Sequence, residues 1–437
     1  MSVQTQILSN NVTLITEPVA GVKTAAVGFW FRTGSRFEPE NMRGISHFVE
    51  HMLFKGTSTR SAFDIAASFD RIGGYINAYT DRENLCIHCV VPADYVTDAV
   101  KIITDMTSSS LFDSKEVERE RSVIKNEIIA SLEDSEEVAL DAASAAVWPN
   151  HPVSVPIAGT VEDVEGLSRE DLYSWYTDYI KNGATVVCVA GCFEKECLES
   201  VLETLPNRSS ADWSSIHGLA PQWTSGLRFQ DAPFNQMQLF MQFPLEPHIS
   251  EKDYYTWAIV NALVGDTMSS RLFQKLREEG GYSYNVYSFP TYYTDAACWC
   301  AYATASKKDT AGVVKTMYRE LEKLKQDSFS EEEQNAACEH ICGEEIISSE
   351  DMEYRVKRLF RNYSFGFSQK STEEILSLIR SISKKEIEKT IQTLLDFDNA
   401  SLFVYGSNPS KTLKDKIEKI QTGIKIRKPL KKEQNQC

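Results

Sequence analysis

Hydrophobic positions alternate with polar ones in some stretches and recur every three to four residues in others, which predicts strands and helices interleaved along the chain. In the first half, apolar strand-like runs lead into helical patterns, and a Gly-Gly turn introduces a pair of strands. The predicted strands span residues 11–18, 24–38, 73–92 (as a pair) and 184–191, and the predicted helices span residues 43–54, 61–73, 94–107 and 114–148.

The second half repeats this plan. "GGYSYNVYSF" mirrors "GGYINAYT", and "EEIISSED" resembles "NEIIASLED". Self-similarity over about two hundred residues indicates duplicated domains rather than a short-period repeat. Further strands are predicted at 227–246 and 400–407, and further helices at 253–265 and 269–280.

Two homologous domains follow from this repeat. Hairpin-like strand pairs among helices predict an α+β fold, in which each domain is a mainly antiparallel sheet covered by helices. Residues 208–222 are rich in Ser, Ala, Pro and Gly, which is typical of a linker. We therefore expect a first domain at 1–207 and a second at 223–437.

Composition narrows the functional classes. The net charge of −16 argues against nucleic-acid binding, which needs a basic surface. No apolar run is long enough to span a membrane, and the N-terminus has no pattern of a signal or transit peptide, so we expect a cytoplasmic protein. In such a compartment the ten cysteines are expected to be reduced thiols rather than a disulfide framework.

The chain has only seven histidines, and two of them stand four apart in "HFVEH", residues 47–51. Positions i and i+4 lie on one face of a helix, so His47 and His51 can present two imidazoles to one metal ion. Glu50, at i+3 from His47, lies on the same face. A catalytic zinc needs three protein ligands and an open position, so a third ligand must come from elsewhere.

Glu127 is the best candidate for the third ligand. It lies 76 positions beyond His51, on the longest helical stretch of the first half. Glu120 stands seven residues earlier, two turns back on the same face, where it could orient a ligand from outside the metal's own shell.

Other interpretations exist for each of these residues. An isolated pair of histidines at this spacing is more often on the surface or in the core, and Glu127 or Glu120 alone suggests a solvated helix face. The full H-x-x-E-H pattern is much rarer and favours a metal site. When Gly73–Gly74 is aligned on Gly280–Gly281, the motif falls on Tyr254, Trp257 and Ala258, so this chemistry is confined to the first copy.

"HFVEH", "ERERSVIKNEI", "GGYINAYTDRE" and "SSRLFQKLREEGGYSYNV" together resemble the pitrilysin family, the inverted-motif zinc peptidases that include insulin-degrading enzyme and the mitochondrial processing peptidases. The resemblance covers nearly the whole chain. It implies two homologous domains that form one half of a clam-shell, of the kind found in short members that pair as dimers. Leu85 departs from the family, in which threonine is common at that position.

The resemblance also implies roles for individual residues. His47, His51 and Glu127 match the ligands of one Zn²⁺ per chain, Glu50 matches the general base on zinc-bound water, and Glu120 matches a supporting glutamate. The remaining matches are Asn77 and Ala78 on a strand that pairs with substrate backbone, and Arg277 with Tyr284, which hold substrate at the metal.

The expected function is therefore that of a zinc endopeptidase that hydrolyses unfolded peptides inside a closed chamber. The expected partners are peptides and a second subunit, either a copy of the chain or a related chain, with no nucleic acid and no membrane. Two alternatives stay open: a non-catalytic or processing subunit of a heterodimeric peptidase, and a peptide-binding protein stabilised by zinc.

Overall fold

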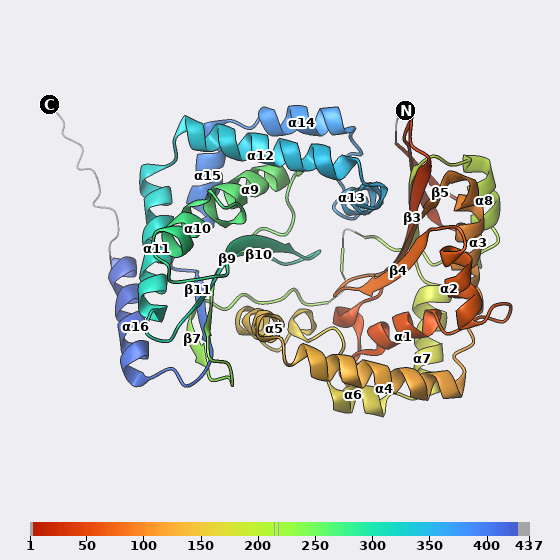
Figure 1. Cartoon of the computed structure of the whole chain (residues 1–437), viewed down its shortest axis with the longest axis horizontal. Coiled ribbons are helices and arrows are strands. Elements are labelled where there is room, and N and C mark those ends of the chain that lie inside the picture. The colour runs from red at the N-terminus through yellow and green to blue at the C-terminus, as the bar shows by residue number, and fades with distance from the viewer. Residues whose placement is uncertain (1–2, 214, 217, 427–437) are drawn as a thin grey trace. The chain divides into compact units, whose positions relative to one another are not determined.

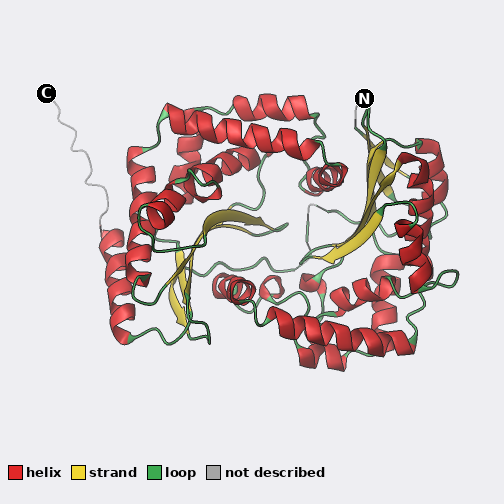
Figure 2. Cartoon of the chain, in the orientation of Figure 1, coloured by secondary structure: helices red, strands yellow, loops and turns green. Residues whose placement is uncertain are grey.

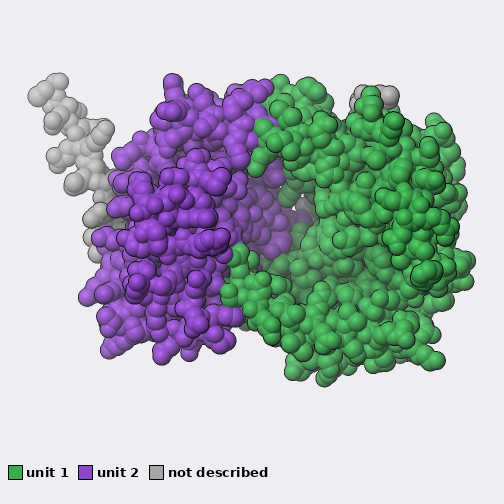
Figure 3. All heavy atoms as spheres, viewed as in Figure 1, with its two compact units in different colours: residues 1–141, 150–219, 343–377 green, residues 142–149, 220–342, 378–437 purple. Residues whose placement is uncertain are grey.

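The computed structural model describes residues 3–213, 215–216 and 218–426, and the remaining residues, Cys437 among them, lie outside the described part. Two compact units divide the chain (Figure 3). Unit 1 comprises residues 1–141, 150–219 and 343–377, and unit 2 comprises residues 142–149, 220–342 and 378–437. These units follow contacts in space, whereas the boundaries at 207 and 223 follow the repeat in the sequence, so those boundaries remain a prediction.

Unit 1 is built on a six-stranded sheet with the order β1-β2-β6-β3-β5-β4. Neighbouring strands are antiparallel except β2 and β6, which are parallel. β4 forms one edge of the sheet and pairs with β5 alone. The strands are β1 (Gln4–Ile7), β2 (Thr13–Pro18), β3 (Thr24–Phe31), β4 (Tyr75–Thr80), β5 (Leu85–Pro92) and β6 (Thr185–Gly191).

Helices cover both faces of this sheet (Figures 1 and 2). The α3 helix packs on β3 and β5, whereas α13 packs on β3, β5 and β6 from the opposite side. The helices of unit 1 are α1 (Ile45–Leu53), α2 (Ala62–Asp70), α3 (Val96–Ser109), α4 (Ser114–Ser131), α6 (Val161–Gly166), α7 (Arg169–Trp175), α8 (Lys195–Leu202) and α13 (Met352–Ser364). Shorter turns are η1 (Ser35–Phe37), η2 (Glu40–Met42), η3 (Ala93–Tyr95), η4 (Pro152–Ser154) and the π-helix η5 (Tyr176–Lys181).

β3 shows why its sequence is almost continuously apolar. Phe29 and Phe31 face the main core under the helices, while Trp30 faces the layer formed by α13. The Trp30 ring stacks on Phe360 of α13 with centroids 4.6 Å apart. A strand buried on both faces loses the simple apolar–polar alternation of a strand with one wet face.

Unit 2 contains a five-stranded sheet with the order β7-β11-β8-β10-β9, antiparallel except between β7 and β11. The strands are β7 (Gly226–Gln230), β8 (Met237–Leu245), β9 (Val286–Tyr292), β10 (Ala297–Ala305) and β11 (Ser401–Tyr405). Its helices are α9 (Glu251–Asn261), α10 (Arg271–Phe273), α11 (Thr310–Asp327), α15 (Lys384–Leu394) and α16 (Lys411–Ile426), with π-helices η6 (Ala262–Asp266) and η7 (Gln274–Glu278). Three helices contribute residues to both units: α5 (Ser135–Val147), α12 (Glu331–Ser349) and α14 (Thr372–Arg380).

The predicted α+β class with mainly antiparallel sheets is confirmed. The predicted helical stretch at 114–148 is divided into α4 and α5, because Asp134 accepts hydrogen bonds from the backbone N–H groups of Glu136 and Glu137 and so begins a new helix. All nine cysteines of the described residues are free thiols, as predicted. Among these same residues, no helix is both long and apolar enough to cross a membrane.

Candidate metal centre

The α1 helix presents a polar face because its other face is buried. Phe48, Val49 and Met52 are fully buried in the core of unit 1, which leaves His47, Glu50 and His51 on the half-buried side. This division follows from helical periodicity.

The beginning of α1 is held by a buried carboxylate. Gly44 adopts a left-handed conformation with φ 81°, and Glu38 accepts hydrogen bonds from the backbone N–H groups of Gly44 (2.7 Å) and Ser46 (2.8 Å). Burial raises the pKa of Glu38 to about 7. Two N–H groups that a helix leaves without partners are thereby satisfied, which fixes the helix that carries the histidines.

Three potential ligand groups converge beside α1. The ligand atoms of His47, His51 and Glu127 all lie within 4.8 Å of one another. Glu127 Oε2 is 4.0 Å from His47 Nε2 and 3.5 Å from His51 Nε2. Two imidazole nitrogens and one carboxylate, of which His47 and Glu127 line a pocket, form a donor set that suits a catalytic zinc ion.

The protonation of His47 is consistent with this donor set. Burial, with the charge of His51 as a smaller cause, lowers the pKa of His47 to about 4, so its ring is neutral near pH 7. The buried Nδ1 of His47 has no hydrogen-bond partner among the described residues. The orientation of the His47 ring is therefore not fixed by a hydrogen bond from Nδ1. A neutral imidazole is the form that binds metals.

A second carboxylate orients His51. The side chain of Glu120 is almost fully buried, and its Oε2 lies 3.1 Å from His51 Nδ1. A proton on Nδ1 would be donated to Glu120, which leaves Nε2 free on the side of Glu127. Lys55 Nζ lies 2.7 Å from the other oxygen of Glu120 and offsets its buried charge. The sequence prediction did not include Lys55, although it stands four residues after His51 in "FKGT".

The Glu50 carboxylate makes its hydrogen bond to the edge strand β4, whereas Glu120 and Glu127 contact the histidines. Thr80 Oγ1 of β4 donates a hydrogen bond of 2.5 Å to Glu50 Oε2. Burial raises the pKa of Glu50, and the hydrogen bond from Thr80 opposes this shift. Thr80 is the second residue that the sequence prediction missed, although it closes the quoted motif "GGYINAYT".

A pocket of about 820 Å³ opens beside these groups within unit 1. His47, Glu50 and Glu127 line it together with Ala78 and Thr80 of β4. Asn77 is exposed on the same strand, and its Oδ1 accepts a hydrogen bond from the backbone N–H of Ala78. The structure therefore brings the predicted metal, base and strand residues of the first half to one place.

The lining of this pocket is strongly acidic. Its carboxylates are Glu50, Glu127, Glu137, Asp141 and Glu162. Arg82 is the only basic side chain among the described lining residues, and it already pairs with Asp141 at 2.8 Å. Burial and the neighbouring Asp141 raise the pKa of Glu137, as expected where like charges gather.

Arg277 and Tyr284 belong to unit 2, and they contact each other there. The Arg277 guanidinium lies 4.7 Å from the centroid of the Tyr284 ring and 4.9 Å from that of Phe273. Arg277 lies on the π-helix η7, and the Tyr284 side chain is 73% exposed. The cation–π contacts hold the guanidinium between two rings while the tyrosine remains accessible.

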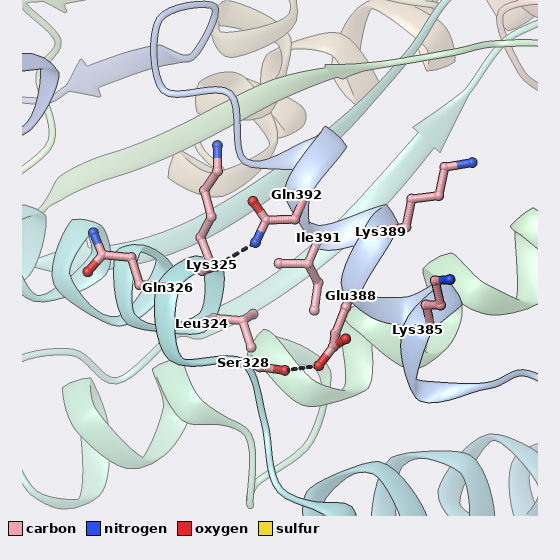
Figure 4. Close-up of a pocket in the computed structure, with 9 residues that line it drawn as sticks. All are labelled: Leu324, Lys325, Gln326, Ser328, Lys385, Glu388, Lys389, Ile391 and Gln392. Atoms are coloured by element: carbon pink, nitrogen blue, oxygen red, sulfur yellow. Dashed lines mark hydrogen bonds between the residues drawn. The ribbon is translucent and has the colours of Figure 1, made fainter. Parts of the chain in front are cut away.

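A second pocket, of about 400 Å³, lies in unit 2 between residues of α11 and α15 (Figure 4). Ser328 donates to its one carboxylate, Glu388, at 2.7 Å, and Gln392 donates to the backbone carbonyl of Lys325. Its described lining residues include no histidine or cysteine, so they offer no metal donor set comparable to that of unit 1.

The centre in unit 1 has the residues of an inverted-motif zinc peptidase. The sequence profile described as "Insulinase (Peptidase family M16)" matches residues 13–161, and the profile "Peptidase M16 inactive domain" matches residues 166–340. The chain is 30% identical over 405 residues to the "Uncharacterized zinc protease YmxG" of Bacillus subtilis, covering 92% of this chain and 98% of that one. The chain belongs to peptidase family M16, which confirms the predicted pitrilysin-type relationship.

Other relatives agree with this assignment. An "uncharacterized zinc protease" of Rickettsia felis is 28% identical over 397 residues, covering 91% of this chain and 96% of that one. Solved structures of a "peptidase M16 inactive domain" from Pseudomonas fluorescens (TM-score 0.84, 15% identity, 93% of this chain and 99% of that one) and of a "protease from Helicobacter pylori" (TM-score 0.81, 16% identity, 92% and 99%) share the fold.

Proposed function

We propose that the chain is a zinc-dependent endopeptidase that hydrolyses unfolded peptides inside a closed chamber. The observation that supports this is the convergence of His47, His51 and Glu127 within 4.8 Å, with Glu50 lining the same pocket. The names of the relatives add support, because they are called zinc proteases. The chamber is inferred from the family resemblance.

The residues of unit 1 suggest a division of labour. His47, His51 and Glu127 would hold one zinc ion, and Glu120 keeps the His51 ring in the orientation needed for it. Zinc, when bound, supplies a Lewis acid that polarises a peptide carbonyl and makes water more acidic. Glu50 accepts the proton from the attacking water and passes it to the leaving amine. The raised pKa of Glu50 brings it closer to the range of an effective base near neutral pH.

The substrate binds as an added strand in this proposal. β4 is an edge strand that carries Asn77 and Ala78, and Ala78 lines the pocket. An extended peptide can pair with such an edge through main-chain hydrogen bonds, which accept many side-chain types. A chamber would exclude folded proteins, so unfolded or short peptides are the proposed substrates.

The acidic pocket predicts a preference for cationic side chains. Changing Glu137, which is exposed, to Gln should lower kcat/KM up to about fivefold for a peptide with Lys near the cleaved bond, because an exposed charge pair contributes about 0.2–1 kcal/mol and about 1.4 kcal/mol corresponds to a factor of ten. A matched peptide with Met instead of Lys should be cleaved as before. The measurement is the ratio of kcat/KM for the two peptides in wild type and variant.

Glu133→Gln is the control for this comparison, because Glu133 is exposed and does not line the pocket. The preference should also weaken as salt is added, since salt screens exposed charges. An unchanged ratio in the Glu137 variant contradicts the proposed role of the acidic lining.

A dimer with a shared site is the proposed assembly, although a related chain could take the place of the second copy. In the family that this chain resembles, the residues that match Arg277 and Tyr284 act at the metal from the opposite half-shell, and residues 1–437 match one half-shell. Arg277 and Tyr284 of one subunit would then hold substrate at the zinc of the other, with Tyr284 donating to the oxyanion that develops.

Complementation tests this assembly. Glu50→Gln and Arg277→Ala chains should each be weakly active alone, because each lacks one component of every site. After unfolding and refolding together, random pairing in a closed two-fold dimer should restore roughly a quarter of wild-type activity. If subunits exchange and activity stays absent, the two residues act within one chain and the shared site is wrong.

Two alternative functions can be distinguished from the proposed one by experiment. They are a non-catalytic or processing subunit of a heterodimeric peptidase, and a peptide-binding protein with structural zinc. The presence of the whole donor set and of Glu50 favours catalysis. Zinc analysis combined with cleavage of a quenched peptide distinguishes them. Cleavage by the purified chain supports the peptidase, whereas bound zinc and peptide without cleavage supports one of the alternatives.

A further inference from the structure

The edge strand β4 has two different sides. Ile76 and Ala78 pack on the core cluster that contains α1, whereas Tyr79 packs on the cluster that contains α13. Successive side chains of a strand alternate between faces, so Thr80 lies on the side of Ile76 and Ala78. This position allows Thr80 to reach Glu50 of α1, 30 positions away in the chain.

The contact between Thr80 and Glu50 is short and directional. The hydroxyl of Thr80 donates to Oε2 at 2.5 Å, within the range of a hydroxyl–carboxylate hydrogen bond. The Glu50 side chain makes no other hydrogen bond to the described residues, so one carboxylate oxygen is held by Thr80 and Oε1 is not held by any of them. Thr80 itself is fixed twice: its backbone pairs with Leu85 of β5, and its β-branched side chain has few rotamers in a strand.

We propose that Thr80 is a positioning residue that holds the Glu50 carboxylate with one oxygen bound and the other directed to the proton it must accept. Because Asn77 and Ala78 lie on the same strand, β4 sets the base and the peptide backbone in one rigid frame. The inference rests on the proposed peptidase function and adds to it a residue that acts through Glu50.

Two substitutions isolate the hydroxyl group. Thr80→Val keeps the size and the strand preference of the side chain and removes only the donor. Thr80→Ser keeps the donor and removes a methyl group. Loss of a hydrogen bond to a charged group should lower kcat for a quenched peptide about 10- to 100-fold in the Val variant, while the Ser variant stays within about threefold of wild type.

The pattern of kinetic constants separates positioning from a general structural effect. The Val variant should keep its KM and its zinc dissociation constant within about twofold of wild type, because valine keeps the shape of the side chain and the lost hydrogen bond is to Glu50, which is not one of the three proposed zinc ligands. A wild-type kcat in the Val variant, equal losses in the Val and Ser variants, or loss of zinc from the Val variant would each overturn the inference.

Crystal structures of zinc-loaded wild type and Thr80→Val provide a test that needs no turnover. The Glu50 carboxylate should leave its wild-type position in the Val variant, and an unmoved carboxylate overturns the inference. If wild type with full zinc cleaves no peptide, the proposed function fails, and this structural comparison still decides whether Thr80 positions Glu50.

Discussion

Glu50→Gln should retain zinc and the fold but lose peptide cleavage by roughly 100-fold or more, the range expected when a general base is removed. The reason is that Glu50 lines the pocket but does not belong to the cluster of three ligand atoms. Glutamine has nearly the same shape and can still accept the hydrogen bond from Thr80, but it cannot take a proton from water. The measurement is kcat for a quenched peptide, together with metal content.

Glu196→Gln is the matched control, because Glu196 is exposed on α8 and does not line the pocket. It should have wild-type activity. Normal turnover in the Glu50 variant with zinc bound would exclude Glu50 as the base.

Removal of a proposed zinc ligand should lower the affinity for zinc as strongly as the Glu50 substitution lowers kcat. His51→Ala and Glu127→Ala should each weaken zinc binding by more than about 100-fold, because even the loss of a residue that only orients a ligand costs about 10- to 100-fold. Glu120→Gln should fall in that smaller range, since Glu120 reaches the site through the His51 ring. Competition with a chromophoric chelator measures all three affinities.

His248→Ala is the control for nonspecific loss, because His248 is exposed and lies outside the cluster of ligand atoms. Its zinc affinity should equal that of wild type. Full metal occupancy in both ligand variants would place the zinc site elsewhere in the chain.

The local part of the site could be predicted from the sequence because helical periodicity is a local rule. The spacing of His47 and His51 requires a common face, and the structure places both rings beside Glu127. Glu127 itself could be selected only with the help of the motif and the family resemblance, since many glutamates lie on helical stretches. Sequence spacing gives no distance between two helices that are joined by a long chain.

Some contacts that support the site could not be predicted from the sequence, namely those of Thr80, Lys55 and Glu38. The contact of Thr80 with Glu50 depends on which face of β4 meets α1, and that is set by strand register and packing. Glu38 holds α1 through backbone N–H groups, which leave no trace in a side-chain pattern.

The place of α13 has a similar explanation. An amphipathic pattern shows that a helix buries one face, but not against which sheet. α13 lies late in the chain, yet it packs on the sheet of unit 1 and stacks Phe360 on Trp30. The repeat in the sequence therefore predicts the duplicated elements better than their packing partners.

We propose that this chain cleaves peptides with a zinc ion held by His47, His51 and Glu127. The most direct measurement is the rate of quenched-peptide cleavage by purified protein after metal removal, during titration with zinc. We predict no cleavage by the metal-free protein and full recovery at about one zinc ion per chain, in line with a single three-ligand catalytic site. Cleavage that persists without metal, or its absence from the purified protein at full zinc occupancy, would contradict peptide hydrolysis at this site.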